Sequence, residues 1–183
     1  MIREAVPADI TRIMELCQEA LDDAFYSHLP LDAQSTRRAM MYCIGSPAQF
    51  CQVVEINGRI EGMLAGTCEK VWHSTRKQAS DLVFYTTPAG RGAGSLLVRR
   101  FIRWARSRPG IGLIGLSVSS GTNVKRTGKM LEKLGLTHVG GIYMETINEQ
   151  STQETRQGPQ VRREGRREGV QEGHCHRASH RRE

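Results

Sequence analysis

The chain has 183 residues, hydrophobic residues at 38% of its positions and a formal net charge of +7. This length predicts one domain with a real core, followed by a tail. No apolar run approaches the roughly 18 residues of a membrane span, and no leader pattern precedes the first strand, so we expect no membrane association. Five scattered cysteines without a CxxC pair indicate a reducing compartment, the cytoplasm.

The first part of the chain combines strand and helix patterns. Residues 2–5 predict a short strand, and residues 7–22 predict a helix that begins at a proline and keeps an apolar stripe. A loop that contains Tyr26 and His28 leads to a second helix over residues 32–45. The first part of the chain therefore has the predicted order strand, helix, helix.

A hairpin comes next. Two strand patterns over residues 52–56 and 59–65 flank Asn57-Gly58, which is the strongest short signal for a β-hairpin. A polar connection then leads to an apolar, aromatic-rich strand over residues 82–87.

The segment 81–106 is the most informative part of the sequence. Its strand ends at Pro88, glycine and arginine punctuation follows over residues 90–94, and a helix begins at once. The helix carries one apolar stripe, made by Leu97, Phe101, Trp104 and Ala105. A glycine-rich turn at a helix N-terminus presents free backbone N–H groups and the positive end of the helix dipole, so we predict a phosphate site here.

The last ordered elements are a strand over residues 111–118, a helix that ends before Gly135, and a strand over residues 138–147. From residue 148 the composition turns to Gln, Glu, Arg, Gly and Ser, which cannot bury enough apolar surface to offset the ordering entropy. We therefore predict a domain over 1–147 and a disordered tail over 148–183. The tail's His174-Cys175-His176 lacks further ligands, so we expect no metal site.

The order of elements resembles the GNAT superfamily of acyl-CoA-dependent N-acyltransferases over residues 1–147. The resemblance depends on Ile2-Arg3 with Pro7-Ala8-Asp9, the hairpin around Asn57-Gly58, Arg91-Gly92-Ala93-Gly94 after Pro88, and Leu131 to Leu136. It implies an α/β fold with a mixed, mostly antiparallel central sheet, flanking helices, and fourth and fifth strands that splay apart. The chain is most similar to small members from phage and prophage genomes, which would place it in the host cytoplasm.

The resemblance also implies acetyl-CoA as co-substrate. Its pantetheine arm would lie between the splayed strands, against the backbone of Phe84, Tyr85 and Thr86. Its diphosphate would be bound by Arg91, Gly92, Ala93, Gly94 and Ser95. Its 3′-phosphate would meet one or two of the basic residues on the two later helices, Arg99, Arg100, Arg103, Arg106, Lys125, Arg126 and Lys129.

Acetyl transfer to an amine needs a base, a polarised carbonyl and a proton for the thiolate. Asp81 is the only acid on the fourth strand and is our predicted base. Many family members use a tyrosine donor where this chain has Leu131, so we choose Tyr143, with Ser119, Ser120, Tyr85 and release to water as alternatives. The loop is also one residue shorter than the usual pattern.

The acceptor is a small-molecule or protein amine, which the resemblance places near Tyr26 and His28, with His73 as a further candidate. Two other readings stay open. One is a catalytically impaired acyl-CoA-binding or virion-associated module, which Leu131 and the short loop would suit. The other is a nucleic-acid-modifying relative, which a basic domain would suit, since residues 1–148 contain 18 Lys and Arg against 13 Asp and Glu. A homodimer is also compatible with the sequence.

Overall fold

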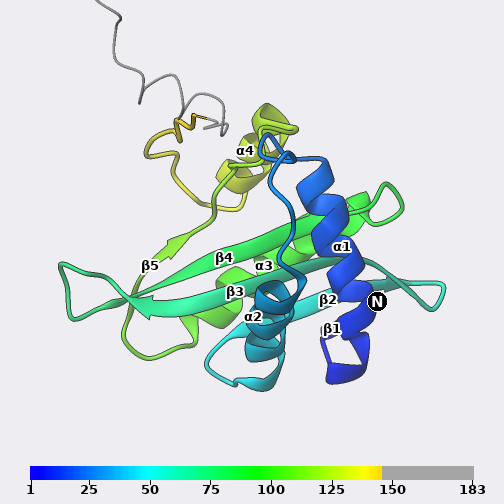
Figure 1. The fold of residues 1–183 in the computed structure, drawn as a ribbon. Helices are drawn as coiled ribbons and strands as arrows, with labels where there is room; N and C mark the ends of the chain where they lie inside the picture. Colours follow the sequence, from blue (N-terminus) through cyan, green and yellow to red (C-terminus); the bar gives the residue numbers. More distant parts are fainter. Residues whose placement is uncertain (146–183) are drawn as a thin grey trace, which may run out of the picture. The chain divides into compact units, whose positions relative to one another are not determined.

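The computed structural model describes residues 1–145, and Met1–Met144 form one compact unit. Its elements follow the predicted order as far as the fourth α-helix (Figure 1). They are β1 (Ile2–Glu4), the 3-10 turn η1 (Pro7–Asp9), α1 (Ile10–Asp22), α2 (Ala33–Gly45), β2 (Phe50–Ile56), β3 (Arg59–Lys70), β4 (Lys77–Thr86), the 3-10 turn η2 (Arg91–Ala93), α3 (Gly94–Arg106), β5 (Ile111–Gly115) and α4 (Val124–Lys133). The predicted tail, with His174-Cys175-His176, lies outside the described residues.

One five-stranded sheet organises the unit, in the order β1-β2-β3-β4-β5. Neighbouring strands are antiparallel except β4 and β5, which are parallel. Asn57 and Gly58 both have positive φ, 51° and 76°, as the predicted hairpin turn requires. The mixed, mostly antiparallel sheet is therefore confirmed.

Helices cover both faces of the sheet (Figure 1). The core under α1 and α2 includes Ile13, Leu16 and Met63, and the core under α3 includes Leu97 and Phe101. All five side chains are fully buried. The apolar stripe predicted for α3 is confirmed, because Leu97, Phe101 and Ala105 are at 0% exposure and Trp104 is half-buried. None of the helices within residues 1–145 is long and apolar enough to span a membrane.

The fourth and fifth strands separate as predicted. They pair from Lys77 and Ile111 to Ser80 and Gly115, where β5 ends. β4 continues to Thr86 and pairs there only with β3. Along this stretch, one edge of β4 has no strand beside it among the described residues. The backbone groups on that edge are therefore available to a ligand.

A bulge shapes β4 where the separation begins. Gly66 is opposite Asp81 and Ala65 is opposite Val83, so Leu82 has no partner on β3. Such an extra residue bends a strand and redirects the side chains that follow it. Here it puts Val83 and Tyr85 on the α1 face and Phe84 on the α3 face.

The strand predicted over residues 138–147 is wrong for its described part. Residues 138–145 form no strand, and Val139 and Tyr143 are 94% and 98% exposed. An edge strand needs a partner, and the neighbouring β5 offers five residues of which two are glycine. Gly140-Gly141 also interrupts the apolar alternation in the middle of the segment.

We predict that Gly66→Ala weakens the bulge. The new Cβ would lie 2.6 Å from the Phe101 ring and 2.8 Å from the Ser80 carbonyl oxygen, closer than real Cβ contacts allow. Overpacking of this kind lowers the free energy of unfolding by about 1–3 kcal/mol, measurable by urea denaturation.

Gly45→Ala is the matched control. Its Cβ would meet no atom within 4 Å and lies at the end of α2, where alanine is favoured by up to about 1 kcal/mol. Equal stability of the two variants would contradict the account of the bulge.

Candidate functional site

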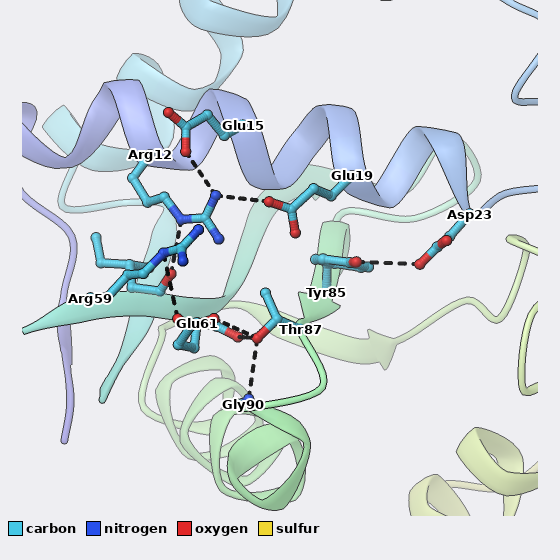
Figure 2. A network of polar contacts seen from close by, with 10 residues as sticks. Arg12, Glu15, Glu19, Asp23, Arg59, Glu61, Tyr85, Thr87 and Gly90 are labelled. Atoms are coloured by element: carbon cyan, nitrogen blue, oxygen red, sulfur yellow. Dashed lines mark hydrogen bonds and ion pairs between the residues drawn. The ribbon is translucent and has the colours of Figure 1, made fainter. Parts of the chain in front are cut away.

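A polar network fixes the loop that follows β4 (Figure 2). The Thr87 hydroxyl donates to Glu61 Oε2 at 2.6 Å, and the Thr87 N–H donates to the Glu61 carbonyl oxygen at 3.0 Å. The Gly90 N–H donates to the Thr87 carbonyl oxygen at 3.0 Å. A Cβ on Gly90 would lie 2.1 Å from the Glu61 carbonyl oxygen, so this position requires glycine. The loop therefore leaves β4 in a fixed direction.

The glycine-rich segment itself forms η2 and the first turn of α3. A Cβ on Gly92 would meet nothing within 4 Å, which leaves open space at the predicted phosphate site, whereas Gly94 is buried beside the Phe84 ring. The Ala93 N–H donates to the Gly90 carbonyl oxygen at 2.9 Å. Of the run of amides predicted to wrap a diphosphate, the one at Ala93 is therefore already used by the 3-10 turn.

The register of β4 decides which of its amides face the open edge. Hydrogen-bonded and non-hydrogen-bonded pairs alternate along antiparallel strands. Because Thr87 donates to Glu61, Tyr85 is also directed at β3, where it is opposite Met63. Phe84 and Thr86 therefore direct their N–H and C=O groups to the edge of β4 that is no longer paired with β5. Of the three predicted backbone partners, Tyr85 faces the wrong way.

Asp81 lies where β4 and β5 part. Its Oδ1 accepts a hydrogen bond from the Ser117 N–H at 2.9 Å, which bridges the two chain segments just after their last paired residues. Burial raises the pKa of the Asp81 carboxyl, and the Ser117 N–H opposes that shift. A raised pKa makes the carboxylate a stronger base than an exposed aspartate.

We call the space between the open edge of β4 and the end of β5 the wedge. Tyr85, on β4, links the wedge to the end of α1. Its side chain lies on the α1 face, and its hydroxyl donates to Asp23 Oδ2 at 3.2 Å (Figure 2). Burial and the Asp23 carboxylate raise the pKa of the Tyr85 hydroxyl to about 12. Tyr85 is therefore a neutral phenol at physiological pH.

The loop that contains Tyr26 and His28 is attached beyond β5. The Phe25 N–H donates to the Ser120 carbonyl oxygen at 2.7 Å, and the Thr122 hydroxyl donates to the Asp23 carbonyl oxygen. Tyr26 is half-buried and His28 is exposed. The structure thus joins this loop to Ser120 and Thr122. His73 lies in the turn between β3 and β4, before the part of β4 that pairs with β5. It is therefore at the opposite end of β4 from the open edge.

Basic side chains surround a groove between α3 and α4, which we call the α3–α4 groove. It has two adjoining hollows. The first has a volume of about 670 Å³ and begins at Ser95, in the first turn of α3; its basic lining comprises Arg99, Lys125, Arg126, Lys129 and Lys133. Four of these residues are predicted partners of a 3′-phosphate. Arg100 lines neither hollow.

Neither Leu131 nor Tyr143 is placed to donate a proton in the site. Leu131 is 8% exposed and packs in the core beneath α3 and α4, so its position faces away from any ligand. Tyr143 is 98% exposed, and the strand that should position it is not formed among residues 138–145. No described element holds Tyr143 at Asp81.

Sequence reasoning missed Glu61, Thr87 and Gly90. Gly90 belongs to the glycine-rich run but differs in role from Gly92, and only the approach of β3 reveals this. The hydroxyl next to Pro88 was a signal for a turn. Its partner, Glu61, is 26 positions away and follows no local pattern.

The chain is similar to known proteins in fold rather than in sequence. No protein-family model matches the sequence, and no curated protein does. Solved structures similar to the chain include the aminoglycoside 6′-N-acetyltransferase AAC(6')-IG from Acinetobacter haemolyticus, at 16% identity and a TM-score of 0.58, which covers 81% of this chain and 98% of that one.

Two further structures have the same fold. AAC(6')-Iy in complex with the bisubstrate analog CoA-S-monomethyl-acetylneamine has 12% identity and a TM-score of 0.59, and covers 81% of this chain and 97% of that one. A protein described as a transcriptional regulator, from Bacillus halodurans C-125, has 25% identity and a TM-score of 0.60, with coverage of 80% and 99%. The likeness to the acetyltransferases establishes the fold.

We predict that Thr87→Val loosens the loop after β4. The Glu61 side chain is 12% exposed and would lose its closest donor, which costs about 1–3 kcal/mol of unfolding free energy. Urea denaturation measures the loss. Thr67→Val, also on the sheet, is the control and should change stability by less than about 0.5 kcal/mol. If both variants were as stable as wild type, the network would not hold the loop.

Proposed function

We propose that this chain, which has the GNAT acetyltransferase fold, transfers an acetyl group from acetyl-CoA to an amine. One observation carries the proposal. β4 parts from β5 at Ser80, keeps an open backbone edge to Thr86, and ends at a fixed loop on the N-terminus of α3. An extended, amide-bearing chain with phosphates at one end matches this surface, and coenzyme A has that form.

The residues of the wedge fit coenzyme A in order. Phe84 and Thr86 would bond the amides of the pantetheine arm. Arg91, Gly92, Gly94 and Ser95 would receive the diphosphate at the N-terminal end of α3, where the helix dipole favours negative charge. The first hollow of the α3–α4 groove adjoins Ser95 and would take the 3′-phosphate. The similar AAC(6')-Iy structure, with its CoA-containing analog, supports this assignment.

Asp81 is the proposed base. The nitrogen of the neutral acceptor amine attacks the thioester carbonyl carbon, and the Asp81 carboxylate takes the proton that this nitrogen loses as the C–N bond forms. A free backbone N–H at the Asp81 end of the open edge of β4 stabilises the resulting oxyanion. The C–S bond breaks, the carbonyl reforms, and coenzyme A leaves as a thiolate.

The thiolate must then gain a proton. We retain Tyr143 as donor on the condition that acyl-CoA orders the segment 138–145 beside β5. Otherwise water protonates the thiolate, which is a tolerable leaving group because a thiol has a pKa of about 8.5. Tyr85 is the poorer choice, because its proton is already donated to Asp23.

The acceptor is a small-molecule or protein amine. It would enter beside the loop of Tyr26 and His28, which the contact between Phe25 and Ser120 keeps against the end of β5. Three similar structures are aminoglycoside acetyltransferases by name, which supports a small-molecule amine. We place the reaction in the cytoplasm, that of the host if the gene is of phage origin, and regard a homodimer as compatible with it.

A second function is favoured by the state of the proton donor. With Leu131 in the core and Tyr143 exposed, the wedge could bind acyl-CoA without turning it over. Tight acetyl-CoA binding with no thiol release across a panel of primary amines would support such a binding module, and thiol release would exclude it.

The first test is Gly92→Val. Its side chain would enter the open space at the diphosphate site, where no protein atom lies within 4 Å of the new Cβ. We expect the Kd for coenzyme A, measured by calorimetry, to rise about tenfold or more, equivalent to ~1.4 kcal/mol or more. Gly45→Val, also in open space but on α2, is the control and should bind as wild type does. Unchanged binding by Gly92→Val would contradict the phosphate site.

The second test is Asp81→Asn. Loss of a general base lowers turnover by about 100-fold or more, and the limb of the rate that rises with pH as Asp81 ionises should disappear. Thiol release from acetyl-CoA with a panel of amines gives the rate. Glu69→Gln, which removes an exposed carboxylate from β3, should keep the wild-type rate and pH profile.

Stability separates a lost base from a lost fold. Because the pKa of Asp81 is raised in the folded state, the folded chain binds this proton more tightly than the unfolded chain, so ionisation costs stability as the pH rises through the range between the two pKa values. Asp81→Asn avoids that cost and should be at least as stable as wild type at neutral pH. A stable variant with wild-type turnover would remove Asp81 from the mechanism.

A further inference from the structure

The charges of the domain are divided along the chain. Residues 1–81 contain eight Lys and Arg against eleven Asp and Glu. Residues 82–144 contain ten Lys and Arg against one acid, Glu132. The second stretch includes α3, β5 and α4, so the positive charge gathers on the elements that line the α3–α4 groove. This division is much sharper than the net charge suggests.

The basic residues form two rows that face the groove. Arg99, Arg103 and Arg106 follow one side of α3 at helical spacing, and Lys129 and Lys133 follow α4 at a spacing of four. All five are exposed. Within residues 1–145 none of them forms an ion pair, since the basic partners in the five ion pairs there are Arg3, Arg12 and Arg59. The rows repel each other until an anion lies between them.

The second hollow extends beyond the place proposed for coenzyme A. It has a volume of about 360 Å³, and its lining is Arg99, Ile102, Arg103, Arg106, Lys133 and Leu134. It shares Arg99, Lys133 and Leu134 with the first hollow, so the two are continuous. Arg106 is eleven positions after Ser95 on α3, about 16 Å along the helix. One 3′-phosphate beside Ser95 cannot neutralise both ends.

We propose that this second hollow binds the phosphodiester backbone of a single nucleic-acid strand. Arg103, Arg106 and Lys133 supply charge for successive phosphates. Ile102 and Leu134 supply an apolar floor for sugar and base. A positively charged groove that follows the backbone of a strand is the arrangement by which proteins bind single-stranded nucleic acid. The inference does not depend on acetyl transfer, because Arg103 and Arg106 line only the second hollow and take no part in the proposed reaction.

The test uses the full chain and fluorescein-labelled oligo(dT) of 20 nucleotides, with binding followed by anisotropy at several salt concentrations. Arg103→Glu/Arg106→Glu should raise the Kd at least tenfold. It should also reduce the slope of log K against log salt by about 1.4, since each phosphate contact on a single strand contributes about 0.7. Arg37→Glu/Arg38→Glu changes the net charge equally on α2, outside the groove, and should stay within twofold of wild type.

The controls separate this site from the coenzyme A site. Because the two hollows share Arg99 and Lys133, saturating coenzyme A should weaken oligo(dT) binding only in part. Arg103→Glu/Arg106→Glu should bind coenzyme A as wild type does, since neither residue lines the first hollow, and this also shows that the variant is folded. Five results would each overturn the proposal. They are equal weakening by the two charge reversals, no effect of the groove reversal, full displacement of oligo(dT) by coenzyme A, tighter binding of a duplex of equal length, and no binding by the wild-type chain.

Discussion

The separation of β4 from β5 at Ser80 and Gly115 is the constraint on which the site depends. Backbone N–H and C=O groups form hydrogen bonds wherever a partner is available. A strand that loses one neighbouring strand therefore keeps a row of these groups free on that edge. The row on β4 is short, ends at the N-terminus of α3, and begins beside Asp81. A ligand that satisfies this row is therefore aligned between a base at one end and a phosphate site at the other.

Two close approaches of backbone make this geometry rigid. Gly66 allows the bulge that aims Asp81 and the residues after it, and Gly90 allows the loop to press against Glu61. Thr87 joins the loop to β3 by hydrogen bonds from its hydroxyl and its N–H. Because these contacts lie within the protein, the protein itself holds the open edge and the space at Gly92 in place. Such preorganisation reduces the ordering cost of binding.

The sequence predicted the elements that have a local cause. Asn57-Gly58 determines its hairpin, Asp32 accepts hydrogen bonds from the N–H groups of Gln34 and Ser35 at the start of α2, and the α3 stripe is buried. β3 and β4 extend further than predicted, into residues 66–70 and 77–81, because pairing with each other holds polar stretches that have no apolar alternation. The strand predicted over 138–147 is not formed over its described residues, 138–145, because an apolar pattern does not by itself supply a neighbouring strand to pair with. Glu61 and Thr87 meet only through the fold, so no local pattern could predict their contact.

The central claim is that coenzyme A lies along the open edge of β4. Amide hydrogen exchange with and without acetyl-CoA tests it most directly, because exchange reports protection residue by residue. The account predicts slower exchange at Phe84 and Thr86 and in the segment Arg91 to Ser95, with no change in β1 and β2. Protection confined to other elements, or none at saturating acetyl-CoA, would contradict it.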